Sequence, residues 1–160
     1  MLTMSAFATT GDRQAEYIQL RLLIGEQHFS EALDRCRILI EKYPDFVYLY
    51  ETMAEIALYA QDLSGAAKFF EERIEDGTSL ELSYFGLGTV YFNKAAYREA
   101  SLCFDRAIEL GIAAPECYRN FVYAYERLEG VDASIRFFNS FIVFPCPSFL
   151  IFSGLLITNV

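Results

Sequence analysis

A 34-residue repeat constrains the fold of this 160-residue chain more than any other feature of its sequence. Four independent columns of similar residues recur at that interval. The first column holds small residues, at Ala32, Ala66, Ala100 and Ser134. Two apolar columns lie three positions before it and four positions after it, at Phe29, Leu63, Tyr97 and Val131 and at Cys36, Phe70, Phe104 and Phe138. Tyrosines form the fourth column, at Tyr50, Tyr84 and Tyr118. A fixed period of this length indicates a protein built from stacked structural units.

Each unit has the pattern of two amphipathic helices. In the third unit, the first helix is predicted from apolar or small residues at i, i+3, i+4 and i+7, which are Tyr84, Leu87, Gly88 and Tyr91. A second such stripe follows a break at Ala95 and consists of Tyr97, Ala100, Phe104 and Ala107. The missing side chain at Gly88 is expected to let Ala100 of the partner helix come close. A single helical hairpin cannot bury both of its faces, so the units are expected to stack into a solenoid.

These spacings resemble those of the tetratricopeptide repeat (TPR) family, whose 34-residue unit is a helix–turn–helix. The resemblance implies an all-α, right-handed superhelical TPR solenoid of about four helix-turn-helix repeats over 13–148. The expected repeats are 13–46, 47–80, 81–114 and 115–148, with 1–12 as an N-terminal extension and 149–160 as an apolar C-terminal tail. The first repeat departs from the family pattern, because Glu16 and Leu20 stand where a bulky ring and a small residue are usual.

The resemblance also implies a function, since TPR proteins are typically scaffolds that bind a peptide or helix of another protein in a concave groove. We therefore expect a non-enzymatic scaffold or adaptor. The family register places twelve principal groove residues at Tyr17, Arg21, Tyr48, Glu51, Glu55, Tyr59, Phe85, Thr89, Phe92, Asn93, Arg119 and Tyr123. The same register adds Gln14, Ile24, Leu58, Leu82, Glu116, Glu126 and Arg127. Exposed rings gathered on one wall are typical of a protein-binding surface.

The charge of the chain limits the class of partner. Its net charge is −9, which argues against nucleic acid, because nucleic-acid-binding proteins present basic surfaces to the phosphates. The Lys, Asn and Arg residues with which some TPR proteins clamp a carboxylate-terminated tail are missing at the corresponding positions. Glu51 and Glu55 would repel such a tail. The expected partner is a protein or peptide segment that is apolar or mildly basic.

Residues for catalysis or metal binding are sparse. The four cysteines form no C-x-x-C motif, and His28 is the only histidine, so no zinc-ligand spacing can be assembled. We expect no catalytic residues, no metal and no cofactor. The first residues lack the basic and apolar segments of a signal peptide, which predicts reduced thiols and a cytoplasmic location.

The C-terminal segment breaks the pattern, because 137–160 contains no charged residue. It could pack on the last repeat, join two copies of the chain in a homo-oligomer, anchor the chain in a membrane, or be an altered terminus. Membrane contact is not favoured, since Pro145 and Pro147 would interrupt a spanning helix. Two other functions therefore stay open: a small TPR-type chaperone for an exported or assembling client, and a tail-anchored membrane adaptor.

Overall fold

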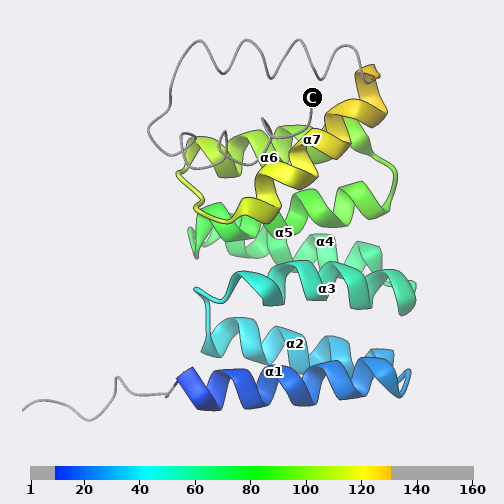
Figure 1. Ribbon diagram of the computed structural model, residues 1–160, viewed down its shortest axis with the longest axis vertical. Coiled ribbons are helices and arrows are strands. Elements are labelled where there is room, and N and C mark those ends of the chain that lie inside the picture. Colours follow the sequence, from blue (N-terminus) through cyan, green and yellow to red (C-terminus); the bar gives the residue numbers. More distant parts are fainter. Residues whose placement is uncertain (1–9, 131–160) are drawn as a thin grey trace, which may run out of the picture.

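A computed structural model describes residues 10–130 of the chain, and within that range it contains seven helices and no strand (Figure 1). The helices are α1 (Thr10–Gly25), α2 (Phe29–Lys42), α3 (Val47–Tyr59), α4 (Leu63–Glu75), α5 (Leu80–Asn93), α6 (Tyr97–Glu109) and α7 (Pro115–Glu129). The first helix begins at Thr10, inside the expected extension 1–12. The second helix expected for the fourth repeat, the tail 149–160 and residues 1–9 lie outside the described residues.

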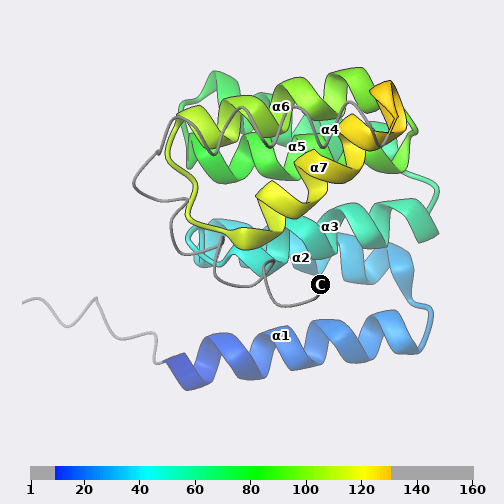
Figure 2. The same cartoon turned by 45° about the horizontal axis from the view of Figure 1, so that its top comes forward.

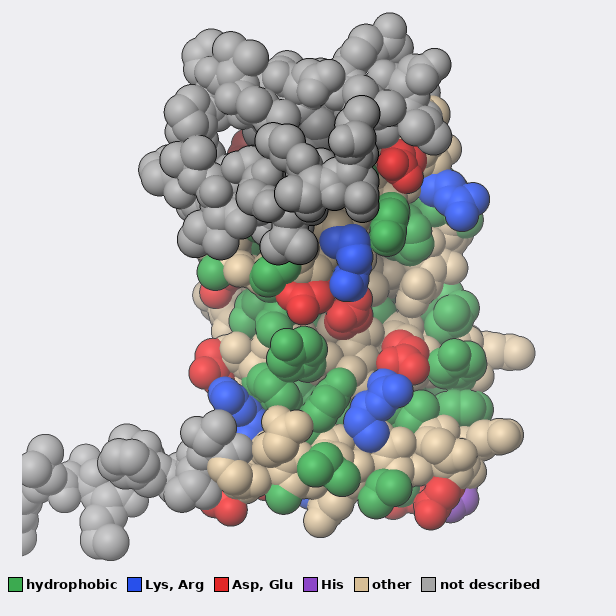
Figure 3. Space-filling model, viewed as in Figure 1, with side chains coloured by type: hydrophobic (Ala, Val, Ile, Leu, Met, Phe, Trp, Pro, Cys, Tyr) green, Lys and Arg blue, Asp and Glu red, His purple; other side chains and the backbone are tan. Residues whose placement is uncertain are grey.

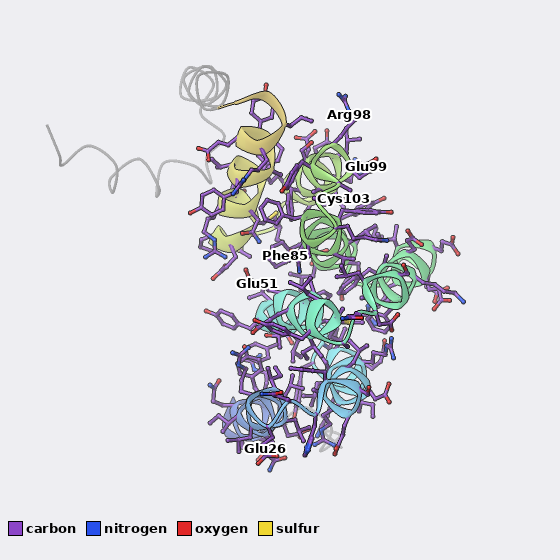
Figure 4. All side chains as sticks on the ribbon, turned by 90° about the vertical axis from the view of Figure 1, so that its right-hand side faces the viewer. Glu26, Glu51, Phe85, Arg98, Glu99 and Cys103 are labelled. Carbon is purple, nitrogen blue, oxygen red and sulfur yellow. The ribbon has the colours of Figure 1, made fainter. Side chains whose placement is uncertain are left out.

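The helices stack in chain order into one continuous row, as Figures 1 and 2 both show. Each helix packs on the next, and the first helices of successive repeats also touch, α3 on α5 and α5 on α7. Viewed along the helix axes, α1, α3 and α7 border one side of the stack, and α2 and α4 the other (Figure 4). The expected all-α superhelical solenoid of TPR-type hairpins is thus confirmed, with three complete hairpins and the first helix of a fourth described.

The repeat columns are the core of the stack. Ala32, Ala66 and Ala100 are completely buried, and so are the rings of Phe70 and Phe104. A small side chain in each second helix lets two helices approach closely, and the large rings fill the space on either side. Burying one such ring contributes roughly 1.5–3 kcal/mol, so the recurring rings stabilise each repeat against the next.

The turns repeat as regularly as the core. Gln27, Gln61 and Ala95 each adopt a left-handed backbone, with φ of 63°, 59° and 58°, and each follows the first helix of a hairpin. The amide of the third residue past the helix, such as that of Asp62, donates to a carbonyl five residues earlier and thereby satisfies one of the last carbonyls of the helix. Between repeats, Gly77 and Gly111 take the same role at φ of 70° and 87°. The same backbone conformation thus recurs in the turn of each of the three complete hairpins.

Two glycines of α5 receive aromatic rings. A Cβ added at Gly86 would lie 2.5 Å from Cζ of Phe70, and one added at Gly88 would lie 2.6 Å from Cε1 of Phe104. The sequence had suggested that Gly88 makes room for Ala100. In the structure, Gly88 makes room mainly for the Phe104 ring. Gly86 does the same for the Phe70 ring of the preceding repeat, so each glycine makes room for a ring of one neighbouring helix, α4 or α6.

Replacing Gly86 with Ala is expected to lower the free energy of unfolding by about 1–2 kcal/mol. The methyl group overlaps the fully buried Phe70 ring, and this overpacking outweighs the roughly 1 kcal/mol gained in helix propensity. Gly25→Ala is the matched control, because no atom lies within 4 Å of its added Cβ. Urea denaturation of both variants checks the prediction, and equal stability of the two would contradict it.

In the first repeat, Glu16 stands where a bulky ring is usual, and it makes polar contacts there. Its Oε1 accepts hydrogen bonds from Lys42 Nζ at 2.5 Å and from the Tyr43 hydroxyl at 3.1 Å, and its Oε2 lies 3.3 Å from Arg35 Nη2. The hydrogen bond from Lys42 is the main reason that the pKa of Glu16 is below its ordinary value. Glu16 therefore ties α1 to α2 by charge where other repeats use packing.

The lowered pKa makes this contribution depend on pH. It is fully present above the ordinary glutamate pKa and is lost as the pH falls through the lowered value in the folded protein. Glu16→Gln is expected to reduce the melting temperature by about 1–3 °C at pH 7 and by less at pH 3. Thermal melts at both pH values, with Glu31→Gln as an exposed control, measure it. A deficit that is equal at both pH values would contradict the prediction.

Candidate functional site

The first helices of the repeats lie along one face of the stack, here called the concave face after the prediction above, and Figure 3 shows this face. Hydrophobic side chains are spread over it, and its acidic and basic groups lie next to one another rather than in separate patches (Figure 3). Three tyrosines expected on this face are exposed. Tyr48 and Tyr59 of α3 are 48% and 55% exposed, and Tyr123 of α7 is 49% exposed. Leu58, next to Tyr59, is exposed as well.

Two residues expected in the groove are instead part of the core. Phe85 is completely buried, with its ring centroid 6.2 Å from that of Phe104. Thr89 is 7% exposed, and its hydroxyl donates to the carbonyl of Phe85 at 2.9 Å. The reason is the position of α5, which is recessed between α3 and α7 (Figure 4). The Arg119 guanidinium of α7 reaches Glu51 of α3 at 2.8 Å, so the two outer helices meet across the register position of Phe85.

Other expected groove residues are partly or fully covered. Phe92 is half-buried against Tyr97, with ring centroids 5.4 Å apart. Asn93 is half-buried and donates from Nδ2 to the carbonyl of Ala54 at 3.0 Å, which links α5 to α3. Among the secondary positions, Ile24 and Leu82 are also buried. The register places these residues on the first helices, but contacts with other helices of the stack cover them.

The carboxylates at the centre of the face are already paired. Arg21 Nη1 lies 2.6 Å from Glu55 Oε2, and this bond is the main reason that the pKa of Arg21 is raised. Glu51 is paired with Arg119, as described above. The expectation that Glu51 and Glu55 select the charge of a partner therefore needs correction. Both are neutralised by arginines of this chain, which leaves the centre of the face without net charge.

Tyr17 joins α1 to α3 at the start of the face. Its hydroxyl lies 3.0 Å from Oγ1 of Thr52, and its ring meets the edge of Phe46 at a centroid distance of 5.3 Å. Tyr48 packs on the same Phe46 ring at 5.5 Å. These contacts hold the exposed ring of Tyr48 in a fixed position, which lowers the entropy cost of binding to it.

A pocket of about 630 Å³, here called the edge pocket, opens where α3, α5 and α7 begin. Its apolar wall includes Val47, Leu82, Ile112, Ala114 and Pro115. The lining also includes Tyr48 and three carboxylates, those of Asp45, Glu81 and Glu116. The register had placed Tyr48, Leu82 and Glu116 in the groove. Most of the other residues come from turns between repeats, for which helical periodicity gives no signal.

Groups that could carry covalent or metal chemistry are poorly placed in residues 10–130. No three His, Cys, Asp or Glu side chains there come together as metal ligands. Burial raises the pKa of Cys103 and Cys117 to about 12, and it raises the pKa of Cys36 as well, so these thiols stay protonated. His28 is exposed in the turn after α1, beside Glu26. The absence of enzymatic activity stays a prediction.

No helix between residues 10 and 130 combines the length and the apolar character needed to cross a bilayer. The uncharged segment 137–160, on which the membrane and homo-oligomer alternatives depend, lies outside the described residues.

Comparison with known proteins supports the fold. No protein-family model matches the sequence, and no curated protein is similar to it. Among solved structures, the chain is similar to MamA 41-end from Desulfovibrio magneticus RS-1, with a TM-score of 0.52 and 12% sequence identity. The match covers 84% of this chain and 76% of that one. At this identity the likeness concerns the fold alone, and it supports a TPR-like helical solenoid.

The burial of Phe85 yields a direct test. Phe85→Ala is expected to cost about 3–5 kcal/mol of unfolding free energy, because it leaves a cavity between α5 and α6. Tyr123→Ala, at an exposed ring of the same face, is expected to cost less than about 1 kcal/mol. Chemical denaturation compares the two variants. If Phe85→Ala proved as mild as Tyr123→Ala, the assignment of Phe85 to the core would be wrong.

Proposed function

We propose that this protein is a non-enzymatic interaction scaffold that binds a segment of another protein along the concave face of α1, α3, α5 and α7. The observation that supports the proposal best is the set of exposed tyrosines, Tyr48, Tyr59 and Tyr123, on a face whose central charges are paired. Tyrosine is enriched among residues that dominate binding energy, because it offers a large rigid ring with a polar end.

The neutral centre of the face favours an apolar stretch of the partner. A strongly charged segment would have to displace Arg21 from Glu55 or Arg119 from Glu51. The interaction energy of the new ion pair would then only replace the energy of the pair that was broken. An apolar segment instead covers the tyrosine rings without breaking either pair. The three described cysteines are unbridged, which fits a role in a reducing compartment such as the cytoplasm.

A defined probe can test the proposal. A dodecapeptide library displayed on phage is selected on the full chain, and the enriched peptides are synthesised and titrated. We expect the triple variant Tyr48→Ser/Tyr59→Ser/Tyr123→Ser to weaken their binding at least about tenfold, because truncation of a few anchoring rings typically removes most of the affinity.

The control removes comparable apolar surface from the other side of the stack. Ile38 of α2 and Leu102 of α6 are 58% and 64% exposed, so Ile38→Ser/Leu102→Ser should leave both the fold and the affinity unchanged. Far-UV circular dichroism verifies that both variants keep their helices. Failure to enrich any peptide, or equal losses in the two variants, would refute the concave face as the binding surface.

A further inference from the structure

The edge pocket differs from the rest of the concave face in its charge. Glu81 and Glu116 lie in the first turns of α5 and α7, and no ion pair of either is described within residues 10–130. No Lys or Arg belongs to the described lining. The charges of Glu81 and Glu116 at this edge are thus not paired within this part of the chain, whereas Glu51 and Glu55 at the centre are neutralised.

The third carboxylate of the pocket shows how the same edge accommodates a cation. Arg13 of α1 lies with Nη1 3.5 Å from Asp45, and its guanidinium carbon lies 4.6 Å from the centroid of the Phe46 ring. One guanidinium is therefore held between a carboxylate and an aromatic face. The edge pocket offers the same two kinds of contact, a carboxylate from Glu81 or Glu116 and an aromatic face from the exposed ring of Tyr48. No cation of this chain belongs to the described lining there.

The form of the pocket favours an organic cation over a metal ion. Its carboxylates do not meet in a group of three that could hold a metal. Its volume of about 630 Å³ falls in the range of pockets for organic ligands, and the wall beside the carboxylates is apolar. A Lys or Arg side chain suits such a pocket, because its methylene stem packs on apolar atoms while its charged end meets the carboxylates.

The pocket is also continuous with the proposed binding face. Tyr48 lines the pocket and is one of the three exposed tyrosines of the concave face, so a chain that covers these rings reaches the pocket. We propose that the edge pocket binds one Lys or Arg side chain of the partner segment, beside the apolar residues that cover the tyrosines. This inference rests on the proposed function and adds to it a recognition element for one positive charge.

The double variant Glu81→Gln/Glu116→Gln tests the inference, because it removes both charges at nearly constant volume. The dodecapeptide library is selected in parallel on the full-length wild type and on this variant. Wild-type selections are expected to enrich Lys or Arg at a fixed distance from apolar residues, and selections on the variant are expected to lose this preference. Replacing the enriched Lys with norleucine, or the enriched Arg with citrulline, should weaken binding to the wild type at least about tenfold and to the variant less than threefold.

The matched control is Glu31→Gln/Glu99→Gln, which makes the same change of charge in the first turns of α2 and α6. Glu99 lies on the opposite side of the stack from Glu51 (Figure 4). This control should keep the basic preference, which separates contact in the pocket from the general attraction of an acidic protein. Added salt should reduce the contribution that the basic residue of the peptide makes to the affinity for the wild type. It should reduce the contribution of the apolar peptide residues less.

The outcomes distinguish the two proposals. Peptides that bind through the tyrosines but show no basic preference would overturn the pocket and leave the scaffold function intact. A basic preference that the Glu31→Gln/Glu99→Gln control also loses would overturn the pocket as well. If no peptide bound through the concave face, both proposals would fail.

Discussion

The packing of aromatic rings against glycines of α5 is the interaction on which the arrangement of the neighbouring helices depends. Phe70 enters at Gly86 and Phe104 enters at Gly88, so α5 is drawn close to the repeat before it and to its own partner helix. No other pair of helices in residues 10–130 packs as extensively as α5 and α6. Because interiors are packed to the density of crystals, a single methyl group at either glycine would have to displace a buried ring.

The tight packing of α5 has a consequence for the surface. With α5 recessed, the helices on either side approach one another, and Arg119 of α7 bonds Glu51 of α3. Phe85, at the equivalent position of the helix between them, becomes core, and Asn93 bonds the backbone of α3. The exposed tyrosines described on the concave face belong to α3 and α7.

The distribution of charge follows from the same geometry. Contacts between first helices pair Arg21 of α1 with Glu55 of α3, and Arg119 of α7 with Glu51 of α3 past the recessed α5. The middle of the face is therefore neutral despite a net charge of −9 for the chain. The turns that begin α5 and α7 lie at the edge, where no arginine within residues 10–130 is paired with Glu81 or Glu116. A neutral centre with an acidic edge is the basis for the proposed partner segment, in which one basic residue adjoins an apolar stretch.

The sequence by itself determined the helical hairpins, their 34-residue period and their stacking, because each depends on spacing along the chain. Ala32, Ala66 and Ala100, or the rings of Phe70 and Phe104, are predictable as core from period alone. It also identified the exposed Tyr48, Tyr59 and Tyr123. Only the tertiary structure decided which of the remaining groove positions stay open, which carboxylates find an arginine, and where a pocket forms. Those properties depend on contacts between residues 34 or 68 positions apart in the sequence. They also depend on how far α5 is recessed behind α3 and α7, which the period of the sequence does not encode.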